Sequence, residues 1–349
     1  PYQETSDVNN RQNPIYHYFY DLAESLSDIY TLISPARFLF NAGLTPAAWN
    51  QKMLDDKHLK VVYFNQDASL CFPNTDIKGG ITITIHNKNV VYGAIKKFIP
   101  NELLRSIASK FTQDSENNLS QIVFSGRSDL KFNDVFLDTF PNSKNDRVAF
   151  MRIKRPAIQE LGPNEEYELK SSTFEALPYI FEDSVDDKNA YYHLLGLVSA
   201  KREWKYIKRD YMTPRYPKQN NIDKFKVMIP ESNGSGTLGE PLGKFEIGYP
   251  GDSSTTTFIG VGAFDTLEEA QNCSKYLKSK LVRCLLGILK ITQHNPQATW
   301  AYVPMQDFSP SSDIDWSKTI AEIDLQLYEK YHLSPEERAF IEEKVMPMD

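Results

Sequence analysis

Apolar residues recur at helical spacing near the start of the chain. Between Pro14 and Ser27 one helical face gathers Ile15, Phe19, Leu22, Ala23 and Leu26, which predicts a helix with this face buried. A short apolar strand is expected at 29–33, and a second helix from Thr45, an N-cap residue followed by proline, to Asp55. Further strands are expected at 59–64 and 80–85. This order predicts the second half of an open α/β sheet that finishes in a hairpin.

A second amphipathic pattern lies between residues 275 and 290. Its apolar residues gather on one side of a helical wheel, and most of its basic residues lie away from them. The helix is predicted to begin near Thr266, with Glu268 and Glu269 in the first turn, where acidic side chains favour the positive end of the helix dipole. Such a helix could pack on a core and still present cations to a phosphate backbone. Those cations are Lys275, Lys278, Lys280, Arg283 and Lys290.

The net charge of −7 is concentrated at the end of the chain. Residues 307–349 hold eleven acidic and four basic residues, which accounts for all of it. Residues 201–226, in contrast, hold nine basic and three acidic residues among aromatic ones, a mixture that suits phosphate contacts. A solvated surface beside an aromatic core explains the same pattern. The candidates for DNA contact in this stretch are Lys201, Arg202, Lys205, Lys208, Arg209, Arg215 and Lys218.

Composition indicates an intracellular protein. A chain of 349 residues is long enough for two domains or more. Cys71, Cys273 and Cys284 form no CxxC pair and occupy apolar positions, which predicts reduced, buried thiols and neither a disulfide frame nor a zinc site. The histidines show no metal-ligand spacing. We expect a cytoplasmic location, since no apolar run approaches the length of a membrane span and the N-terminus has no signal-peptide pattern.

Two short motifs carry weaker signals. Residues 234–239 satisfy Gly-x-Gly-x-x-Gly, but Pro241 and Gly243 stand where a phosphate-binding helix should begin, so a flexible loop is expected. Glu168-Leu169-Lys170 is similar to the end of a magnesium-binding nuclease set. No Pro-Asp pair precedes it, so a nuclease site there lacks its first ligand.

The N-terminal motifs resemble those of one enzyme family. The chain opens Pro1-Tyr2, and further on Phe72-Pro73 precedes the Lys-Gly-Gly turn at 78–80. Over residues 1–97 this order resembles the adenine-N6 DNA methyltransferases that carry an (Asn/Asp)-Pro-Pro-(Tyr/Phe) loop. It is similar to their gamma arrangement, in which the cofactor-binding half comes first and target recognition last. The family's Asp-x-Phe-x-Gly-x-Gly cofactor loop is expected upstream of Pro1, and the chain contains no copy.

The C-terminal region also resembles part of these enzymes. Short strings there are similar in order and spacing to the recognition region of large bacterial restriction-modification methyltransferases; they lie at 226–230, 248–251, 269–272, 275–280, 290–293 and 313–316. The stretch 98–225 is the least recognisable. We expect base-reading side chains there, among the Asn, Gln, Arg and Ser residues between Arg105 and Arg155, with Arg127 and Ser128 as candidates.

The resemblance implies a reaction. A methyl group would pass from S-adenosylmethionine to N6 of an adenine that is flipped out of double-stranded DNA. Pro1 would fix the catalytic turn, and Tyr2 would stack on the flipped base; hydrogen bonds would align the amino group without a general base. One residue of 81–85 would line the pocket wall. Since the cofactor-binding half is expected outside this chain, we expect the chain alone to be inactive.

The segments predicted are a catalytic half-domain at 1–97, a mixed α+β target-recognition region at 98–306 and an acidic helical tail at 307–349. Three functions stay open. The chain is the catalytic and recognition part of an adenine-N6 DNA methyltransferase, or the same part of a combined restriction endonuclease and methyltransferase, whose nuclease would need magnesium, or a DNA-binding specificity module without chemistry. A sheet without its other half would expose an edge and apolar surface.

Overall fold

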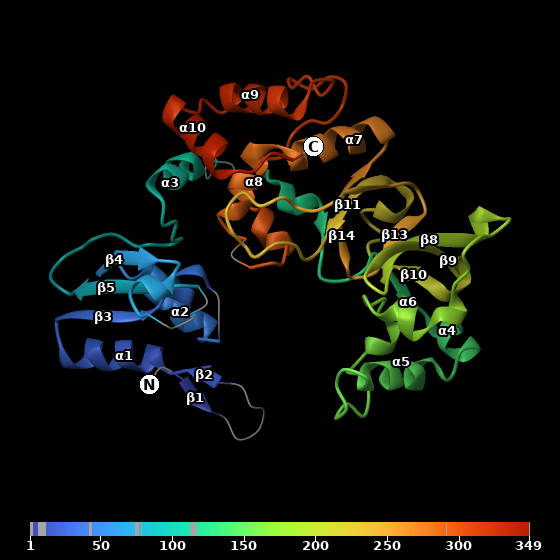
Figure 1. Ribbon diagram of the computed structural model, residues 1–349, viewed down its shortest axis with the longest axis horizontal. Coiled ribbons are helices and arrows are strands. Elements are labelled where there is room, and N and C mark those ends of the chain that lie inside the picture. Colours follow the sequence, from blue (N-terminus) through green and yellow to red (C-terminus); the bar gives the residue numbers. More distant parts are fainter. Residues whose placement is uncertain are drawn as a thin grey trace. The chain divides into compact units, whose positions relative to one another are not determined.

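A computed structural model describes residues 3–5, 12–41, 44–73, 77, 79–111, 117–290 and 292–348 (Figure 1). The chain forms two compact units, residues 1–105 and 106–349. Its architecture is mixed α/β, and the described strands form five small sheets. Helix α3 (Glu102–Ser109) contains the boundary between the units.

Unit 1 contains the elements that the hydrophobic pattern predicts. Confirmed in type and place are α1 (Tyr16–Leu26), β3 (Ile29–Pro35), α2 (Ala47–Asp55), β4 (Leu59–Asn65) and β5 (Ile81–Asn87). The predicted cap at Thr45 is wrong, because the N-cap residue of α2 is Pro46 and the Thr45 hydroxyl donates to Asn50 Oδ1. β5 lies between β3 and β4 and is antiparallel to both, so β4 and β5 make the predicted hairpin. Two short strands, β1 (Gln3–Thr5) and β2 (Gln12–Pro14), pair separately. A larger open sheet stays a prediction.

The core of unit 1 lies between α1, α2 and this three-stranded sheet. Tyr20 of α1 is 1% exposed, and its hydroxyl lies 2.9 Å from the hydroxyls of Ser34 and Thr84, which ties the helix to two strands. Burial and these hydrogen bonds together fix α1 on the sheet. The prediction that the apolar face of α1 is buried is wrong: Phe19, Leu22 and Leu26 are 45%, 54% and 76% exposed, because the helix packs on the sheet through Tyr16 and Tyr20.

Unit 2 is built on three sheets. Their strand orders are β12-β11-β14-β6, β13-β8-β9 and β10-β7. One core gathers side chains from β7, β8 and the short helices around them, including Phe132, Phe136 and Leu194, each 0% exposed. The strands are β6 (Val123–Phe124), β7 (Leu130–Phe132), β8 (Tyr191–Val198), β9 (Lys201–Lys208), β10 (Met212–Pro214), β11 (Phe225–Pro230), β12 (Glu246–Gly248), β13 (Asp252–Ser254) and β14 (Phe258–Phe264).

Most helices of unit 2 begin at a side chain that caps the first turn. Thr266 accepts the N–H of Glu269, whose carboxylate accepts the N–H of Thr266, so the helix start predicted near Thr266 is confirmed. The same reciprocal cap occurs at Thr319 and at Ser334. The helices are α4 (Asp134–Thr139), α5 (Ser143–Arg152), α6 (Thr173–Ala176), α7 (Leu267–Lys278), α8 (Lys280–Gly287), α9 (Ile320–Lys330) and α10 (Pro335–Lys344).

The basic helix is broken in the middle, which the sequence did not indicate. Ser279 is extended (ψ 149°), and its hydroxyl accepts the N–H of Val282, so it ends α7 and caps α8. Asp324 of α9 accepts the N–H groups of Lys280 and Leu281 at 2.9 and 3.0 Å. A helix start that is satisfied by two side chains is stable at this position, so two helices replace one.

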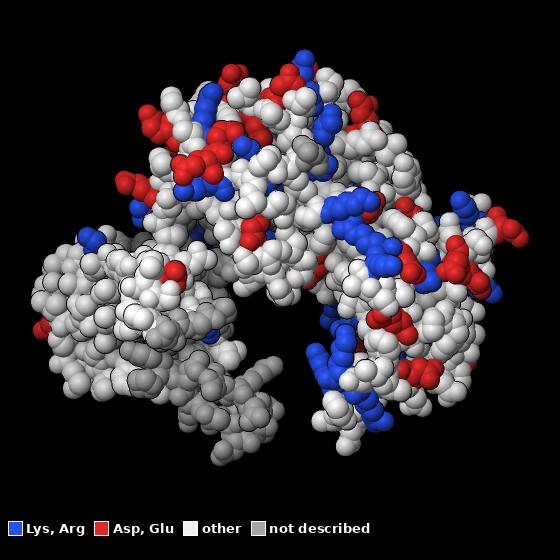
Figure 2. Space-filling model, in the orientation of Figure 1, with Lys and Arg blue, Asp and Glu red and all other residues white. Residues whose placement is uncertain are grey.

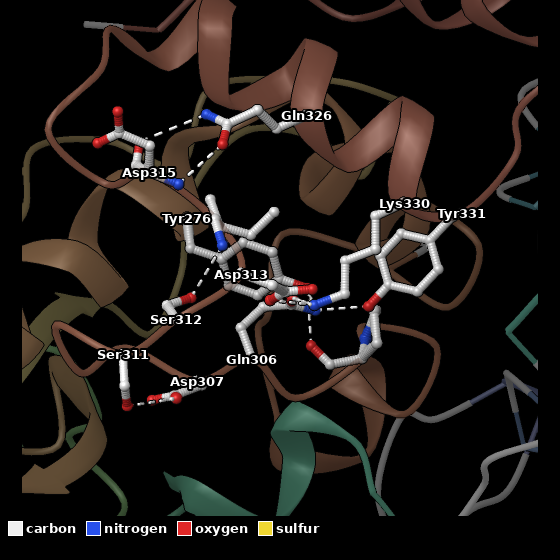
Figure 3. Close-up of polar contacts among 12 residues, drawn as sticks. Tyr276, Gln306, Asp307, Ser311, Ser312, Asp313, Asp315, Gln326, Lys330 and Tyr331 are labelled. Carbon is white, nitrogen blue, oxygen red and sulfur yellow. Dashed lines mark hydrogen bonds and ion pairs between the residues drawn. The ribbon is translucent and has the colours of Figure 1, made fainter.

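The acidic C-terminal segment is fixed to the rest of unit 2. Lys330 Nζ donates to Gln306 Oε1 at 2.9 Å and pairs with Asp313 at 2.8 Å, and Gln306 Nε2 donates to the Tyr331 hydroxyl at 2.6 Å (Figure 3). Acidic side chains gather over α9 and α10 (Figure 2). Several of them cap helices or pair with lysine, so the net charge of this segment serves the fold.

The cysteine prediction is right for two residues and wrong for one. Cys273 and Cys284 are buried, and burial raises the pKa of both thiols, that of Cys284 to about 12. Cys71, in the turn after β4, is exposed. Its apolar neighbours in the sequence do not pack over it, since Leu70 is 71% and Phe72 is 41% exposed. None of the described helices has the length and hydropathy to cross a membrane.

Candidate nucleic-acid interface

The predicted catalytic pair, Pro1 and Tyr2, lies outside the described residues, so its role stays a prediction. The strand expected to line the pocket is β5. Thr82 and Thr84 of β5 are 0% exposed, whereas Ile83 and Ile85 are half-buried. Because side chains alternate between the faces of a strand, the two isoleucines share the face that is less covered.

The glycine turn before β5 packs against its own chain. Gly80 has φ +76°, and a Cβ built on it would lie 2.2 Å from the carbonyl oxygen of Asn65. Gly79 has φ +86° and would bring its Cβ within 2.9 Å of Arg37 Cγ. Close backbone approach and positive φ explain why glycine stands at both positions. Lys78, the first residue of the turn, lies outside the described residues.

The first basic stretch is used mostly within the fold. Arg202 pairs with Glu246 at 3.2 Å, Lys205 with Asp183 at 2.8 Å, and the guanidinium of Arg209 lies 4.2 Å from the centre of the Tyr192 ring. Partners of this kind remove much of a cation's capacity to bind phosphate. The cations of this stretch that are exposed and have no side-chain partner among the described residues are Lys201, Lys208 and Lys218.

The second basic stretch points largely inward. Arg283 is 2% and Lys290 5% exposed, and burial lowers the pKa of both. Their donors are directed at backbone carbonyls, Arg283 at Gly239 (3.3 Å) and Lys290 at Asn233 (3.0 Å). The side chains of this helix pair therefore hold loops in place, and Arg283 and Lys290 do not belong to an exposed DNA-binding surface. The other three are half-buried: Lys275 donates to Trp316 O, Lys278 lies beside the Phe245 ring, and Lys280 pairs with Glu342.

A pocket of about 460 Å³ opens in unit 2 where β7 pairs with β10. Its cations are Arg127, Lys131 and Arg215, and its carboxylates are Asp134 and Glu168, so the lining carries one net positive charge. Polar and aromatic groups complete the wall: Phe132, Asn133, Asn164, Tyr167 and Thr213. The wall of this concave surface is mostly polar and charged, which suits a polar ligand better than an apolar one.

Glu168 contacts two arginines that line the pocket. It is 9% exposed, and its Oε2 accepts from Arg215 Nη2 at 2.8 Å, while its Oε1 lies 3.5 Å from Arg127 Nη1. Arg215 also donates through Nε to the carbonyl of Ser128 (3.0 Å) and through its backbone N–H to the carbonyl of Asp129 (2.7 Å). The turn at 125–128 is thus fixed from behind by one arginine and one carboxylate.

The two candidate base-reading residues, Arg127 and Ser128, differ in exposure. The side chain of Arg127 is 64% exposed at the pocket. Ser128, the next residue, is 2% exposed, and its hydroxyl donates to the carbonyl of Ser254 at 2.6 Å. The structure therefore makes Arg127 available for binding and gives Ser128 a structural position.

The sequence reasoning missed most of the pocket. Lys131, Asn164 and Tyr167 come from a strand, a left-handed turn residue (φ +61°) and a short 3-10 helix, and their separation in the chain gives no spacing signal. The end of α5 and the turn after it carry Arg152, Lys154 and Arg155, all exposed; the two arginines belong to the range in which base-reading side chains are expected, and Lys154 was not singled out. Lysine and arginine side chains gather over this turn (Figure 2).

Neither of the two weaker motifs forms the site that its pattern suggests. Both oxygens of Glu168 face guanidinium groups, and Lys170 pairs with Glu165 at 3.2 Å. Among the described residues, no group of three or more His, Cys, Asp and Glu is placed to hold a metal ion. The glycine motif is a loop, as expected, and the backbone N–H groups of Ser235 and Gly236 bind the carboxylate of Glu240 at 2.8 and 3.1 Å.

Comparison with known proteins gives one family match, to the N-terminal part of the chain. Residues 1–72 match the model of the Eco57I restriction-modification methylase family. This N-terminal segment is therefore similar to restriction-modification methylases. No curated protein matches the chain.

Among solved structures, the chain is similar to the type IIG restriction endonuclease BpuSI, with 12% identity and a TM-score of 0.29. The match covers 97% of this chain and 49% of that one, so the chain spans about half the length of that enzyme. A TM-score this low carries no argument about the fold.

Proposed function

We propose that this chain is the end of the catalytic domain and the target-recognition region of a site-specific DNA methyltransferase that modifies N6 of adenine. The observation that carries the proposal is the match of residues 1–72 to a restriction-modification methylase family. The element order of unit 1, with a hairpin at the end of its sheet, agrees with the expected second half of the catalytic domain. Pro1 and Tyr2 end the catalytic loop, and Tyr2 stacks on the flipped adenine.

S-adenosylmethionine is the methyl donor that this proposal implies. The described residues of unit 1 do not fit it on their own, because the one glycine pair before a strand, Gly79 and Gly80, packs against Asn65 and Arg37 and leaves no cradle for a ligand. The pocket beside Arg127 and a second pocket near Phe124 and Phe308 are both lined by unit 2 residues, so neither gives unit 1 a place for the cofactor. We therefore place the cofactor outside these residues and derive no chemical step through it.

Double-stranded DNA is the proposed partner of unit 2. Exposed cations supply the sequence-independent part of DNA affinity, because each phosphate contact releases counterions. The pocket beside Arg127 supplies fixed donors and acceptors of the kind that read base edges. The residues proposed for DNA contact are Arg127, Lys131, Arg152, Lys154, Arg155, Lys201, Lys208 and Lys218.

Binding to random-sequence duplex DNA across a salt series tests the recognition part. We expect the logarithm of affinity to fall linearly with the logarithm of salt concentration, with a slope of about −0.9 for each phosphate contact. The double variant Lys154→Glu, Arg155→Glu should weaken binding and flatten the slope. Lys318→Glu, on the acidic segment, changes the same charge once at an exposed site and should leave the slope unchanged.

The outcomes are distinct. Wild-type chain that does not bind duplex DNA at low salt contradicts a recognition role for unit 2. For the catalytic part, Tyr2→Ala in a longer, methylation-active protein that contains this chain should abolish methylation and leave DNA binding intact. Unchanged methylation in that variant would instead favour a specificity module without chemistry.

A further inference from the structure

The turn at 125–128 presents the guanidinium group of Arg127 to solvent. We propose that Arg127 reads a guanine in the major groove of the target DNA, with Glu168 as the group that positions it. The inference rests on the proposed function of unit 2 as a DNA-recognition region. It adds the base that one side chain recognises, and it names a specificity-determining residue.

Arg127 has the donors that such a contact needs. Its guanidinium has one side-chain contact among the described residues, from Nη1 to Glu168 Oε1 at 3.5 Å. Nη2 and Nε stay available at an exposed position, since the side chain is 64% exposed. Arginine offers its donors in a planar fork, which matches the O6 and N7 acceptors of guanine.

The backbone that follows Arg127 is held by hydrogen bonds. Ser128 donates to the carbonyl of Ser254, and Arg215 donates to the carbonyls of Ser128 and Asp129. Gly126, just before Arg127, is exposed with φ +82°, and no atom of the described residues lies within 4 Å of the place a Cβ would take, so this side of the turn is open to solvent. A side chain on a fixed backbone loses less conformational freedom on binding, which favours a selective contact.

The charges around Arg127 favour a base edge over a phosphate. Glu168 and Asp134 line the same pocket, and a phosphate at Arg127 would lie beside the Glu168 carboxylate. Like charges at this distance repel, whereas the guanine acceptors are neutral. Lys131 is exposed, lines the same pocket and has no side-chain partner among the described residues, so it is the better placed cation for the backbone phosphate.

Selection from a randomised duplex library tests the proposal with the chain as it stands. The wild-type protein should enrich a sequence with at least one required guanine. Arg127→Ala should lose the preference at that single position, by about tenfold to a hundredfold against the other bases. Arg127→Lys separates the two contacts, because lysine keeps the charge but has no fork. It should reduce the preference, because an ammonium group cannot reproduce the two parallel hydrogen bonds of the fork, and a lysine variant that keeps the full preference would overturn the bidentate contact.

Lys131→Ala is the matched control, since it removes an exposed cation from the same pocket. It should weaken binding about equally for all sequences and reduce the salt slope by about one. Replacing the required guanine by 7-deazaguanine, which has no N7 acceptor, should weaken wild-type binding and leave Arg127→Ala unaffected. An unchanged preference in Arg127→Ala overturns this inference alone, whereas wild-type chain that binds no duplex DNA overturns the proposed function as well.

Discussion

Replacing Gly80 by alanine tests whether the glycine turn before β5 is a packing requirement. An alanine at φ +76° carries the strain of a left-handed backbone, about 1–2 kcal/mol. Its Cβ would also lie 2.2 Å from Asn65 O and 2.6 Å from Gln66 Cα, and relieving that contact shifts backbone at a cost of about 1–3 kcal/mol. We expect Gly80→Ala to lower the stability of unit 1 by about 2–5 kcal/mol.

Gly93→Ala is the matched control for this loss. Gly93 has φ +95°, but a Cβ added there would meet no atom of the described residues within 4 Å, so only the backbone strain of about 1–2 kcal/mol applies. Hydrogen exchange of the β5 amides, followed by mass spectrometry of the peptide that covers 81–87, reports the stability of unit 1 without interference from unit 2. Equal protection of β5 in the two variants would refute the argument, because it would mean that the chain yields around the new methyl group without cost.

Three further predictions concern unit 2 and the thiols. Burial raises the pKa of Asp324 to about 6, so the ionised carboxylate is disfavoured in the fold. The free energy of unfolding should therefore fall by up to about 3 kcal/mol as pH rises from below 4 to above 6. Asp324→Asn should flatten this pH dependence in urea titrations at several pH values. Thr266→Ala removes the cap of α7 and should cost about 1 kcal/mol in thermal unfolding, whereas the exposed helix residue Gln271→Ala should change little. A thiol reagent should modify Cys71 alone in the native chain and all three cysteines in denaturant; rapid native reaction of Cys273 would contradict its burial.

Local patterns were sufficient to place the elements of unit 1. Helical and strand periodicities located α1, α2, β3, β4 and β5, but the apolar face read for α1 is exposed in the structure, because Tyr16 and Tyr20 of the opposite face fill the core. The capped start of α7 was also legible, because a capping box is a contiguous signal. The early end of α7 could not be predicted from the sequence, because the second cap of α8 comes from Asp324, more than forty residues further along the chain.

The candidate interface was harder to predict for a physical reason. The number of cations in residues 201–226 is a property of sequence, but their availability depends on partners such as Glu246 and Asp183 that the fold brings to them. The same holds for Arg127, whose orientation depends on Glu168 and Arg215. The local excess of basic residues therefore pointed to 201–226, whereas long-range pairing decides which of the cations there and elsewhere in unit 2 remain available for DNA contact.

Strand β3 has an open edge that pairs with no other described strand. Among the described strands, β5 alone pairs with β3, and Ile29 and Ile33 on β3 are 53% and 44% exposed. An outer strand of seven residues with apolar side chains and one open edge is a template for one more strand. A strand supplied in trans would extend the sheet at this edge. Solutions of the chain should accordingly show concentration-dependent association that Ile33→Lys suppresses, and a peptide that pairs with β3 would be a means to control its solubility.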